Sequence, residues 1–192
     1  NLISVALLNA NLYDKVKSMS YKDGMTGLHN YRFFEMRLEE EIGRARRDET
    51  EVHLLILDVD YFKNYNDSLG HLAGDEVLRK LGGILFRSVR QNDIACRYGG
   101  EEFAIILPGI SRDNAEKVSQ RLRKTVEKTP FPDEYVQPGK RITVSIGLAS
   151  VPRDANDPTT LVKLADTALY QAKESGRNKM VPYNPPEDED VS

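Results

Sequence analysis

The chain has 192 residues, of which 40% are hydrophobic, and this is enough for one globular domain with a helical extension. A formal net charge of −3 argues against nucleic acid or an anionic membrane as the main partner. The single cysteine, Cys96, excludes an internal disulfide and a zinc site built from cysteines, and no apolar run is long enough to span a membrane. We therefore expect a cytoplasmic protein without direct membrane insertion.

The first twenty residues predict an amphipathic helix. Its apolar side chains recur every three or four residues, at Val5, Leu8, Leu12, Val16 and Met19. Such a helix either packs on its own domain or forms a parallel coiled-coil linker, and we favour a linker over residues 1–20 because the stripe precedes the core strands. Because the chain begins at Asn1 without an initiator methionine, we expect a fragment of a larger signalling protein with an upstream sensory domain.

Helical and strand patterns alternate over residues 21–183. Asn30 is the predicted N-cap of a helix from residue 31 to about 47, and the apolar run 52–57 predicts a central strand covered on both faces. The following elements are a helical turn over 61–68, a helix over about 70–90, a hairpin around 96–107, a helix over 113–128, an alternating strand over 142–149, a helix over 159–174 and an edge strand over 180–183. Gly176 is expected to end the last helix.

This pattern predicts an α/β fold in which a mixed sheet carries helices on its faces. The remaining residues, 184–192, form an acidic tail among prolines with almost nothing apolar to bury. We expect this tail to be solvated and disordered.

The predicted hairpin has two glycines and two adjacent carboxylates at its tip: Gly99, Gly100, Glu101 and Glu102. The glycines permit positive φ and remove both Cβ atoms, so a phosphate or another backbone can come close. Neighbouring carboxylates raise each other's pKa and are costly unless a cation or a substrate proton relieves them. On the hairpin alone, a solvated acidic turn is an equally good interpretation.

A second acidic pair, Asp58 and Asp60, ends the predicted central strand and can face Glu101 across neighbouring strands. Hard carboxylate oxygens at this spacing suit Mg²⁺ or Mn²⁺, whereas zinc prefers other ligands. Lys63 could bind phosphate, and several groups that follow could read the edge of a base: Asn66, Asp67 and Asp75. These features together indicate a nucleotide site, although we favour capping or turn roles for Asp60 and Asp67.

Residues 99–103 (GGEEF) resemble the signature of the GGDEF family of diguanylate cyclases. Four other segments agree with motifs of that family in the same order. Residues 23–30 resemble its opening motif, with Met25 in place of a common leucine, and residues 58–67 resemble its acidic metal motif. Residues 70–75 and 172–178 resemble two further motifs at the expected spacing. The resemblance therefore covers about residues 20–183, and five motifs in order are far more specific than one.

The resemblance implies a diguanylate cyclase, which condenses two GTP molecules into cyclic di-GMP and releases two pyrophosphates. Each half-site would belong to one subunit of a homodimer. The implied cofactor is Mg²⁺ or Mn²⁺, with two ions per half-site. Their ligands would be Asp58, Glu101 and the main-chain carbonyl of Val59.

The resemblance also assigns roles to the remaining motif residues. The phosphate-binding groups would be Lys63, Lys173, Arg177 and the main-chain amides of Tyr61 and Phe62. Asn66 and Asp75 would read guanine, with His71 near the nucleoside. Glu101, together with Glu102, would accept the proton of the attacking hydroxyl, and Lys63 would assist catalysis.

Arg90 and Asp93 resemble the R-x-x-D inhibitory site of the family, where product binds, because five residues separate Asp93 from Gly99. We expect Arg90 to lie on the strand that enters the active turn, with Arg121 as a second contributor. An Arg-x-x-Asp pair is also common as a salt bridge at the end of a helix, which is the alternative interpretation.

Two alternative functions stay open. A receptor for cyclic dinucleotides without turnover would lack the metal carboxylates, whereas Asp58, Glu101 and Glu102 are present. A cyclase with relaxed purine specificity is harder to exclude. Asp75 can accept hydrogen bonds from guanine N1–H and N2–H, and adenine offers no such pair of donors, so Asp75 favours GTP.

Overall fold

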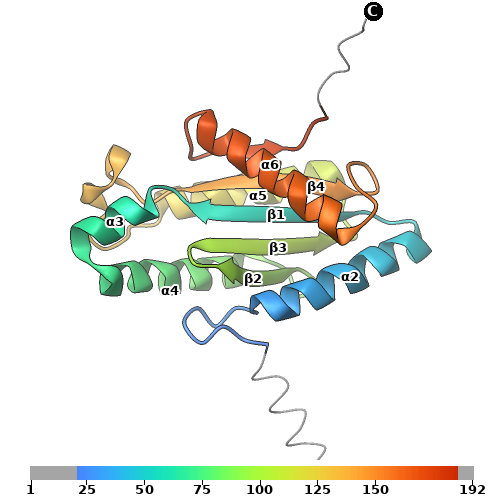
Figure 1. The fold of residues 1–192 in the computed structure, drawn as a ribbon, viewed down its shortest axis with the longest axis horizontal. Helices are drawn as coiled ribbons and strands as arrows, with labels where there is room; N and C mark the ends of the chain where they lie inside the picture. The colour runs from blue at the N-terminus through green and yellow to red at the C-terminus, as the bar shows by residue number, and fades with distance from the viewer. Residues whose placement is uncertain (1–20, 186–192) are drawn as a thin grey trace, which may run out of the picture.

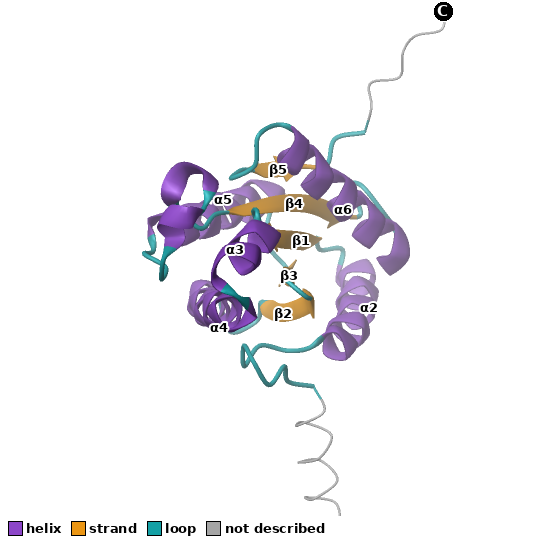
Figure 2. Ribbon diagram, turned by 60° about the vertical axis from the view of Figure 1, so that its left-hand side comes forward, coloured by secondary structure: helices purple, strands orange, loops and turns teal. Residues whose placement is uncertain are grey.

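The computed structural model describes residues 21–185; the linker helix predicted over 1–20 and residues 186–192 of the predicted tail lie outside this range. The described residues fold around a five-stranded sheet with the strand order β2-β3-β1-β4-β5. Figure 1 labels β1 to β4, and Figure 2 labels β5 as well. The strands are β1 (Val52–Val59), β2 (Ile94–Gly99), β3 (Glu102–Pro108), β4 (Val144–Val151) and β5 (Met180–Pro182). Neighbouring strands are antiparallel except β4 and β5, which are parallel, so the predicted mixed sheet is confirmed.

Helices cover both faces of this sheet. They are α2 (Tyr31–Asp48), α3 (Phe62–Leu69), α4 (His71–Ser88), α5 (Arg112–Lys128) and α6 (Pro158–Glu174), and two 3-10 turns (Glu134–Val136 and Pro138–Lys140) precede β4. Figure 2 shows α2 and α6 on one face of the sheet and α4 and α5 on the other. Within residues 21–185, no helix has both the length and the apolar character needed to cross a membrane.

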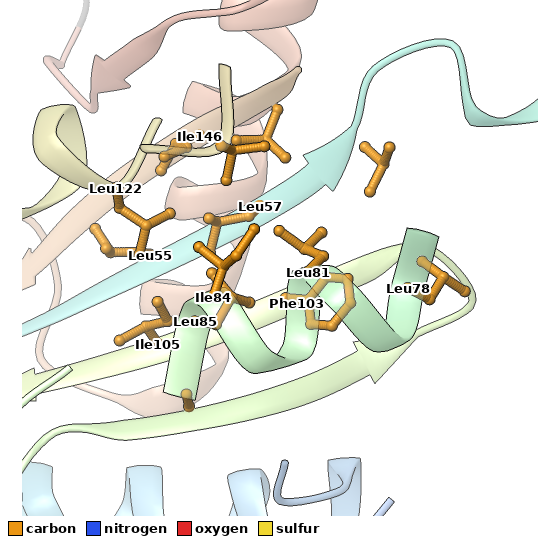
Figure 3. Packing of buried hydrophobic residues seen from close by; sticks show 14 of the residues in the cluster. Leu55, Leu57, Leu78, Leu81, Ile84, Leu85, Phe103, Ile105, Leu122 and Ile146 are labelled. Carbon is orange, nitrogen blue, oxygen red and sulfur yellow. The ribbon is translucent and has the colours of Figure 1, made fainter. Parts of the chain in front are cut away.

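The central strand β1 is buried along its whole length. On one face, Leu55 and Leu57 belong to a hydrophobic cluster with Leu81 of α4 and Leu122 of α5 (Figure 3). On the other face, alternate residues such as Leu54 belong to a second cluster with residues of α2 and α6. The prediction of a central strand covered on both faces is therefore confirmed.

Helix α6 lies close against β4 because residue 147 is a glycine. A Cβ atom at Gly147 would lie 2.0 Å from the carbonyl oxygen of Ala165 and 2.3 Å from the backbone nitrogen of Leu169. No side chain fits there, so the backbones of the strand and the helix can approach each other directly. This contact fixes α6 over the sheet and thereby the position of Lys173 in its last turn.

Several element boundaries differ from the predictions, and those of β1, α4 and β4 differ by two residues. β1 continues to Val59, so Asp58 lies within the strand. α4 ends at Ser88 because Val89 takes an extended conformation, with φ −98° and ψ 155°. β4 begins at Val144, and all of its residues are buried, whereas the prediction was an alternating strand that began at residue 142.

Buried hydrogen bonds explain the alternation of polar residues in β4. The Ser145 hydroxyl donates to Asp60 Oδ1 at 2.7 Å. The Ser150 hydroxyl lies 2.7 Å from His53 Nδ1 and accepts from Arg112 Nη1 at 2.9 Å. Both serines therefore have buried partners, and a polar side chain in this strand does not indicate contact with solvent.

Two predicted helix ends are confirmed. Asn30 Oδ1 accepts a hydrogen bond from the Phe33 backbone N–H at 3.1 Å, as an N-cap does. After α6, Gly176 adopts a φ of +111°, which ends the helix in a conformation that L side chains rarely adopt.

Candidate active site

The carboxylates that were predicted to face each other meet at the end of β1. The antiparallel register of β1 and β3 places Asp58 opposite Glu102. One residue further, the Val59 N–H donates to the Glu101 carbonyl at 3.4 Å. The tip of the β2–β3 hairpin and the end of β1 therefore bring Asp58, Glu101 and Glu102 to one edge of the sheet.

The pKa of each of these three carboxyl groups is raised, mainly by burial. For Glu101 and Glu102, the second cause is the charge of Asp58, and Lys173 partly offsets both effects on the pKa. Glu102 raises the pKa of Glu101 less than burial and Asp58 do. The prediction that neighbouring carboxylates raise each other's pKa is confirmed for the effect of Glu102 on Glu101, but burial and the strand carboxylate Asp58 raise the pKa of Glu101 more.

Lys173 supplies a positive charge to this acidic edge. Its Nζ atom lies 2.9 Å from Asp58 Oδ2. This ion pair is possible because Asp58 projects from β1 toward α6, whose last turn carries Lys173. One lysine faces three carboxyl groups with raised pKa values, so the edge has an excess of negative charge that a bound cation would relieve.

The donor set at this edge fits a hard divalent cation. Asp58 and Glu101 offer carboxylate oxygens, and Val59, the residue after Asp58, offers a main-chain carbonyl oxygen. All three donors are therefore oxygens, which Mg²⁺ and Mn²⁺ prefer as ligands. Among residues 21–185, no three carboxylate, imidazole or thiol side chains form a metal site by themselves. Main-chain oxygen or substrate phosphate would therefore complete the coordination.

The turn after β1 offers groups that bind anions. Tyr61 adopts a left-handed conformation with φ 55° and leads directly into α3, which begins at Phe62. The guanidinium carbon of Arg177 lies 4.6 Å from the centroid of the Tyr61 ring, and Lys63 is exposed in the first turn of α3. The first backbone N–H groups of a helix lack intrahelical partners, so this turn and the two cations suit a phosphate.

Asn66 has a buried side-chain oxygen, Oδ1, that lacks a hydrogen-bond donor among the described residues. A Cβ atom at Gly74 would lie 1.9 Å from that oxygen, so the start of α4 leaves just enough room for the Asn66 side chain. Asp75 follows directly, with its carboxylate 3.7 Å from Arg79, and His71 is exposed at the first residue of α4. A ligand with N–H donors would satisfy Asn66.

The signature turn is held by an arginine that the sequence analysis did not identify. Arg97 donates to the Gly100 carbonyl from Nε at 3.1 Å and from Nη2 at 2.9 Å, and its Nη1 lies 3.3 Å from Asp23 Oδ2. Neither Gly99 nor Gly100 adopts a positive φ. A Cβ atom at Gly100 would meet no atom within 4 Å, and one at Gly99 would lie 3.4 Å from Glu102 Oε2, so packing among the described residues does not require a glycine at either position. For Arg97, the available signal in the sequence was a charged residue within an otherwise apolar strand.

Asp60 is buried, and although its charge raises the pKa of Asp58, its own oxygens are bonded to other parts of the chain. Its carboxylate accepts hydrogen bonds from Thr143, Ser145 and the backbone of Asn178. These are hydrogen bonds to residues 83 to 118 positions away, whereas the prediction was a local capping or turn role. No local pattern in the sequence indicates these partners, because they come from distant parts of the chain.

Arg90 and Asp93 lie in the turn between α4 and β2, so the expectation that Arg90 lies on the strand is wrong. Asp93 Oδ2 accepts from the Arg90 backbone N–H at 2.8 Å, while the Arg90 side chain is exposed and forms no salt bridge with Asp93. Both residues line a cavity of about 430 Å³ together with Phe86. Arg121 Nη2 donates to the Ser88 carbonyl at 3.4 Å, which places Arg121 beside the end of α4.

Comparisons with known proteins agree on the family. The family model described as "Diguanylate cyclase, GGDEF domain" matches residues 20–179. The chain is 39% identical over 171 residues to the response regulator PleD of Caulobacter vibrioides, covering 89% of this chain and 38% of PleD. It is 37% identical over 166 residues to the probable diguanylate cyclase DgcT of Escherichia coli, covering 86% of this chain and 36% of DgcT.

A solved structure shares the fold over most of its length. The coiled coil and GGDEF domain of DgcB from Caulobacter crescentus, in complex with c-di-GMP, superposes with a TM-score of 0.82 at 30% identity. This match covers 94% of each chain. The chain thus spans well under half the length of the curated relatives PleD and DgcT, but it covers nearly all of this structure. The chain belongs to the diguanylate cyclase, GGDEF domain family.

Proposed function

We propose that this domain condenses two GTP molecules into cyclic di-GMP and releases two pyrophosphates, as one half of a homodimer. The observation that carries the proposal is the acidic edge: Asp58, Glu101 and Glu102, all with raised pKa values, lie beside Lys173. Relatives named as diguanylate cyclases support it. A receptor without turnover has no need of three crowded carboxylates, which are costly to keep.

Asp58, Glu101 and the carbonyl of Val59 would hold Mg²⁺ or Mn²⁺, with two ions per half-site. Such ions supply positive charge that lowers the pKa of the 3′-hydroxyl and stabilises the leaving pyrophosphate. The carboxylates are already at the end of a rigid central strand and a paired hairpin, so they lose little freedom when they bind a cation. Lys173 would then exchange Asp58 for a phosphate oxygen.

Lys63, Lys173 and Arg177 would neutralise the triphosphate, and the amides at the Tyr61–Phe62 turn would add contacts to it. In the reaction, the 3′-oxygen of one nucleotide forms a bond to the α-phosphorus of the other, and the bond from that phosphorus to pyrophosphate breaks. The proton of the hydroxyl passes to Glu101 or Glu102. A carboxyl group with a raised pKa is a better proton acceptor than an ordinary one.

Asn66 and Asp75 would read the guanine base, with His71 near the nucleoside. Asp75 accepts from the N1–H and N2–H groups, and the buried oxygen of Asn66 gains the donor that it lacks. Arg90, Asp93 and Arg121 would bind the product and mediate feedback inhibition. The upstream sensory domain, joined through residues 1–20, would control how the two half-sites meet.

Incubation of the purified protein with GTP and Mg²⁺, followed by separation of the nucleotides, tests this function. We expect cyclic di-GMP and pyrophosphate from the unaltered protein. Glu101→Gln should reduce the rate by about a hundredfold or more, the scale of a lost proton acceptor. Because Glu101 is not a core residue, its thermal unfolding should change little. Binding of GTP without any cyclic di-GMP, under a range of protein concentrations, would favour the receptor function instead.

A further inference from the structure

Asp60 joins three separate segments at the active end of the sheet. Its side chain is buried, with 2% of the residue exposed. Oδ1 accepts from the Ser145 hydroxyl at 2.7 Å, and Oδ2 accepts from the Thr143 hydroxyl at 2.7 Å. Oδ2 also accepts from the Asn178 backbone N–H at 3.0 Å. Two of these bonds tie β1 to the start of β4, and the third reaches the turn that follows α6.

That turn has an unusual backbone. Arg177 and Asn178 both adopt left-handed conformations, with φ of 60° and 47°. Consecutive residues with side chains rarely adopt this conformation, and it persists where the surroundings hold it in place. The Asn178 side chain is fixed from α5, because Oδ1 accepts from Arg123 at 2.7 Å and Nδ2 donates to Glu127 at 2.6 Å. Asp60 and α5 together hold the turn.

The conformation of this turn decides where the Arg177 side chain points. Its guanidinium carbon lies 4.6 Å from the centroid of the Tyr61 ring, and Tyr61 follows Asp60 directly in the chain. Tyr61 is also in the left-handed region, with φ 55°. Asp60 thus holds the backbone next to Arg177, and the ring of the adjacent residue supports its guanidinium. The end of α6 also holds Arg177, because its backbone N–H donates to the Ala172 carbonyl at 3.0 Å and its Nη1 donates to the Lys173 carbonyl at 3.4 Å. Residues 60 and 61 add the contact to the next residue of the turn and the ring beneath the guanidinium.

We propose that Asp60 is a positioning residue for triphosphate binding: its carboxylate holds the left-handed Arg177-Asn178 turn, so that the Arg177 guanidinium lies ready over the phosphate-binding turn at Tyr61. This inference rests on the proposed function of the same site. It gives Asp60 a task separate from the metal ligand Asp58, two residues earlier. A guanidinium held in place before binding loses less freedom when phosphate arrives, so affinity for the triphosphate should depend on Asp60.

The variant Asp60→Asn tests the proposal with two measurements, the affinity for a non-hydrolysable GTP analogue with Mg²⁺ and the KM and kcat for GTP. The amide NH₂ can face the Ser145 hydroxyl, and the remaining oxygen still meets Thr143 and Asn178. A neutral amide oxygen accepts more weakly than a carboxylate does, so the hold on Asn178 weakens. We expect the analogue to bind about tenfold more weakly and KM to rise by a similar factor, with a much smaller change in kcat. In an Arg177→Ala background, Asp60→Asn should cause no further loss of affinity.

Ser145→Ala is the matched control. It removes a hydrogen bond to the other oxygen of the same carboxylate and leaves the bond to Asn178, so stability should fall while affinity for the analogue stays unchanged. If Asp60→Asn does not fold, Asn178→Ala removes the hold from α5 and should weaken binding in the same way.

Unchanged affinity in Asp60→Asn, or an equal loss in Ser145→Ala, would overturn the proposal. So would a further loss from Asp60→Asn after Arg177 has been removed. A protein that binds the analogue as expected but forms no cyclic di-GMP would contradict the proposed function and leave the positioning role standing.

Discussion

At the scale of single residues, we expect the charges at the end of β1 to couple the stability of the protein to pH and to divalent cations. The pKa values of Asp58, Glu101 and Glu102 are raised, chiefly by burial, so the folded state binds protons at these groups more tightly than the unfolded state does. Their contribution to the free energy of unfolding therefore falls as pH rises from the ordinary carboxyl range through the raised values. A cation that binds the ionised carboxylates opposes this loss.

We predict that Mg²⁺ raises the melting temperature more at about pH 8 than at about pH 5, because protonation at the lower pH removes the charges that bind it. Thermal unfolding with Mg²⁺ and with a chelator at both pH values, at matched ionic strength, measures this difference. Glu101→Gln should lose most of the Mg²⁺ effect at the higher pH. A shift of the same size at both pH values would mean that the cation does not bind these carboxylates.

A second prediction at this scale concerns the choice of base. Asp75→Ser should reduce the preference for GTP over ATP by about ten- to a hundredfold, because it removes the acceptor for the two guanine donors. Competition between the two nucleotides for binding gives this ratio directly. Asp67→Ser is the control, since Asp67 is exposed on α3 and has no assigned contact with the base. If Asp75→Ser discriminates as well as the parent does, another residue reads the base.

The charged residues at the acidic edge could be predicted from the sequence, whereas the residues whose hydrogen bonds support that edge could not. Asp58 and Glu101 stand at the ends of a strand and a hairpin, so local patterns were enough to bring them together. Asp60 bonds to Asn178, 118 residues away, and Arg97 bonds to Asp23, 74 residues away. Contacts over such separations are set by the packing of the whole sheet, and no local pattern contains them.

At the scale of elements, the close contact between α6 and β4 sets the position of Lys173. We predict that Gly147→Ala lowers the free energy of unfolding by about 1–3 kcal/mol, the usual range for an overpacked core, and lowers activity by displacing α6. Denaturant titration measures the loss of stability, and the rate of cyclic di-GMP formation measures the loss of activity.

Gly43→Ala is the control for Gly147→Ala. A Cβ there would lie 3.8 Å from the flexible end of Arg47, so this change within α2 should stabilise the protein by about 0.5–1 kcal/mol. Equal stability of Gly147→Ala and its parent would contradict this account.

The predictions of element type hold better than those of element ends and of exposure. Continuous apolar residues made β1 recognisable as a covered strand, and Asn30 marked the start of α2. β4 was predicted as an alternating strand because Thr143 and Ser145 alternate with apolar residues. Both hydroxyls donate hydrogen bonds to Asp60 within the fold. The alternating polar residues therefore reflect buried hydrogen bonds, although the same pattern in a sequence suggests contact with water.

At the scale of the whole molecule, the acidic edge and the expected product site lie at opposite ends of β2. Asp93 directly precedes the strand, and the signature turn follows its last residue, Gly99. A strand of this length spans about 20 Å, so product bound at Arg90 and Asp93 cannot overlap with GTP at Asp58 in the same domain. Inhibition by product would then act through the relative placement of two domains, and it would not be competitive with GTP.

Arg90→Ala tests this separation. The side chain of Arg90 is exposed and bonds to no catalytic residue, so the rate without product should match that of the parent. The loss of a charge-assisted contact of about 1.5–3 kcal/mol should weaken inhibition by cyclic di-GMP about ten- to a hundredfold. Progress curves with added product measure it, and Arg32→Ala, an exposed arginine on the opposite face of the sheet, controls for net charge. Unchanged inhibition in Arg90→Ala would mean that product acts elsewhere, whereas a lower rate without product would place Arg90 within the catalytic half-site.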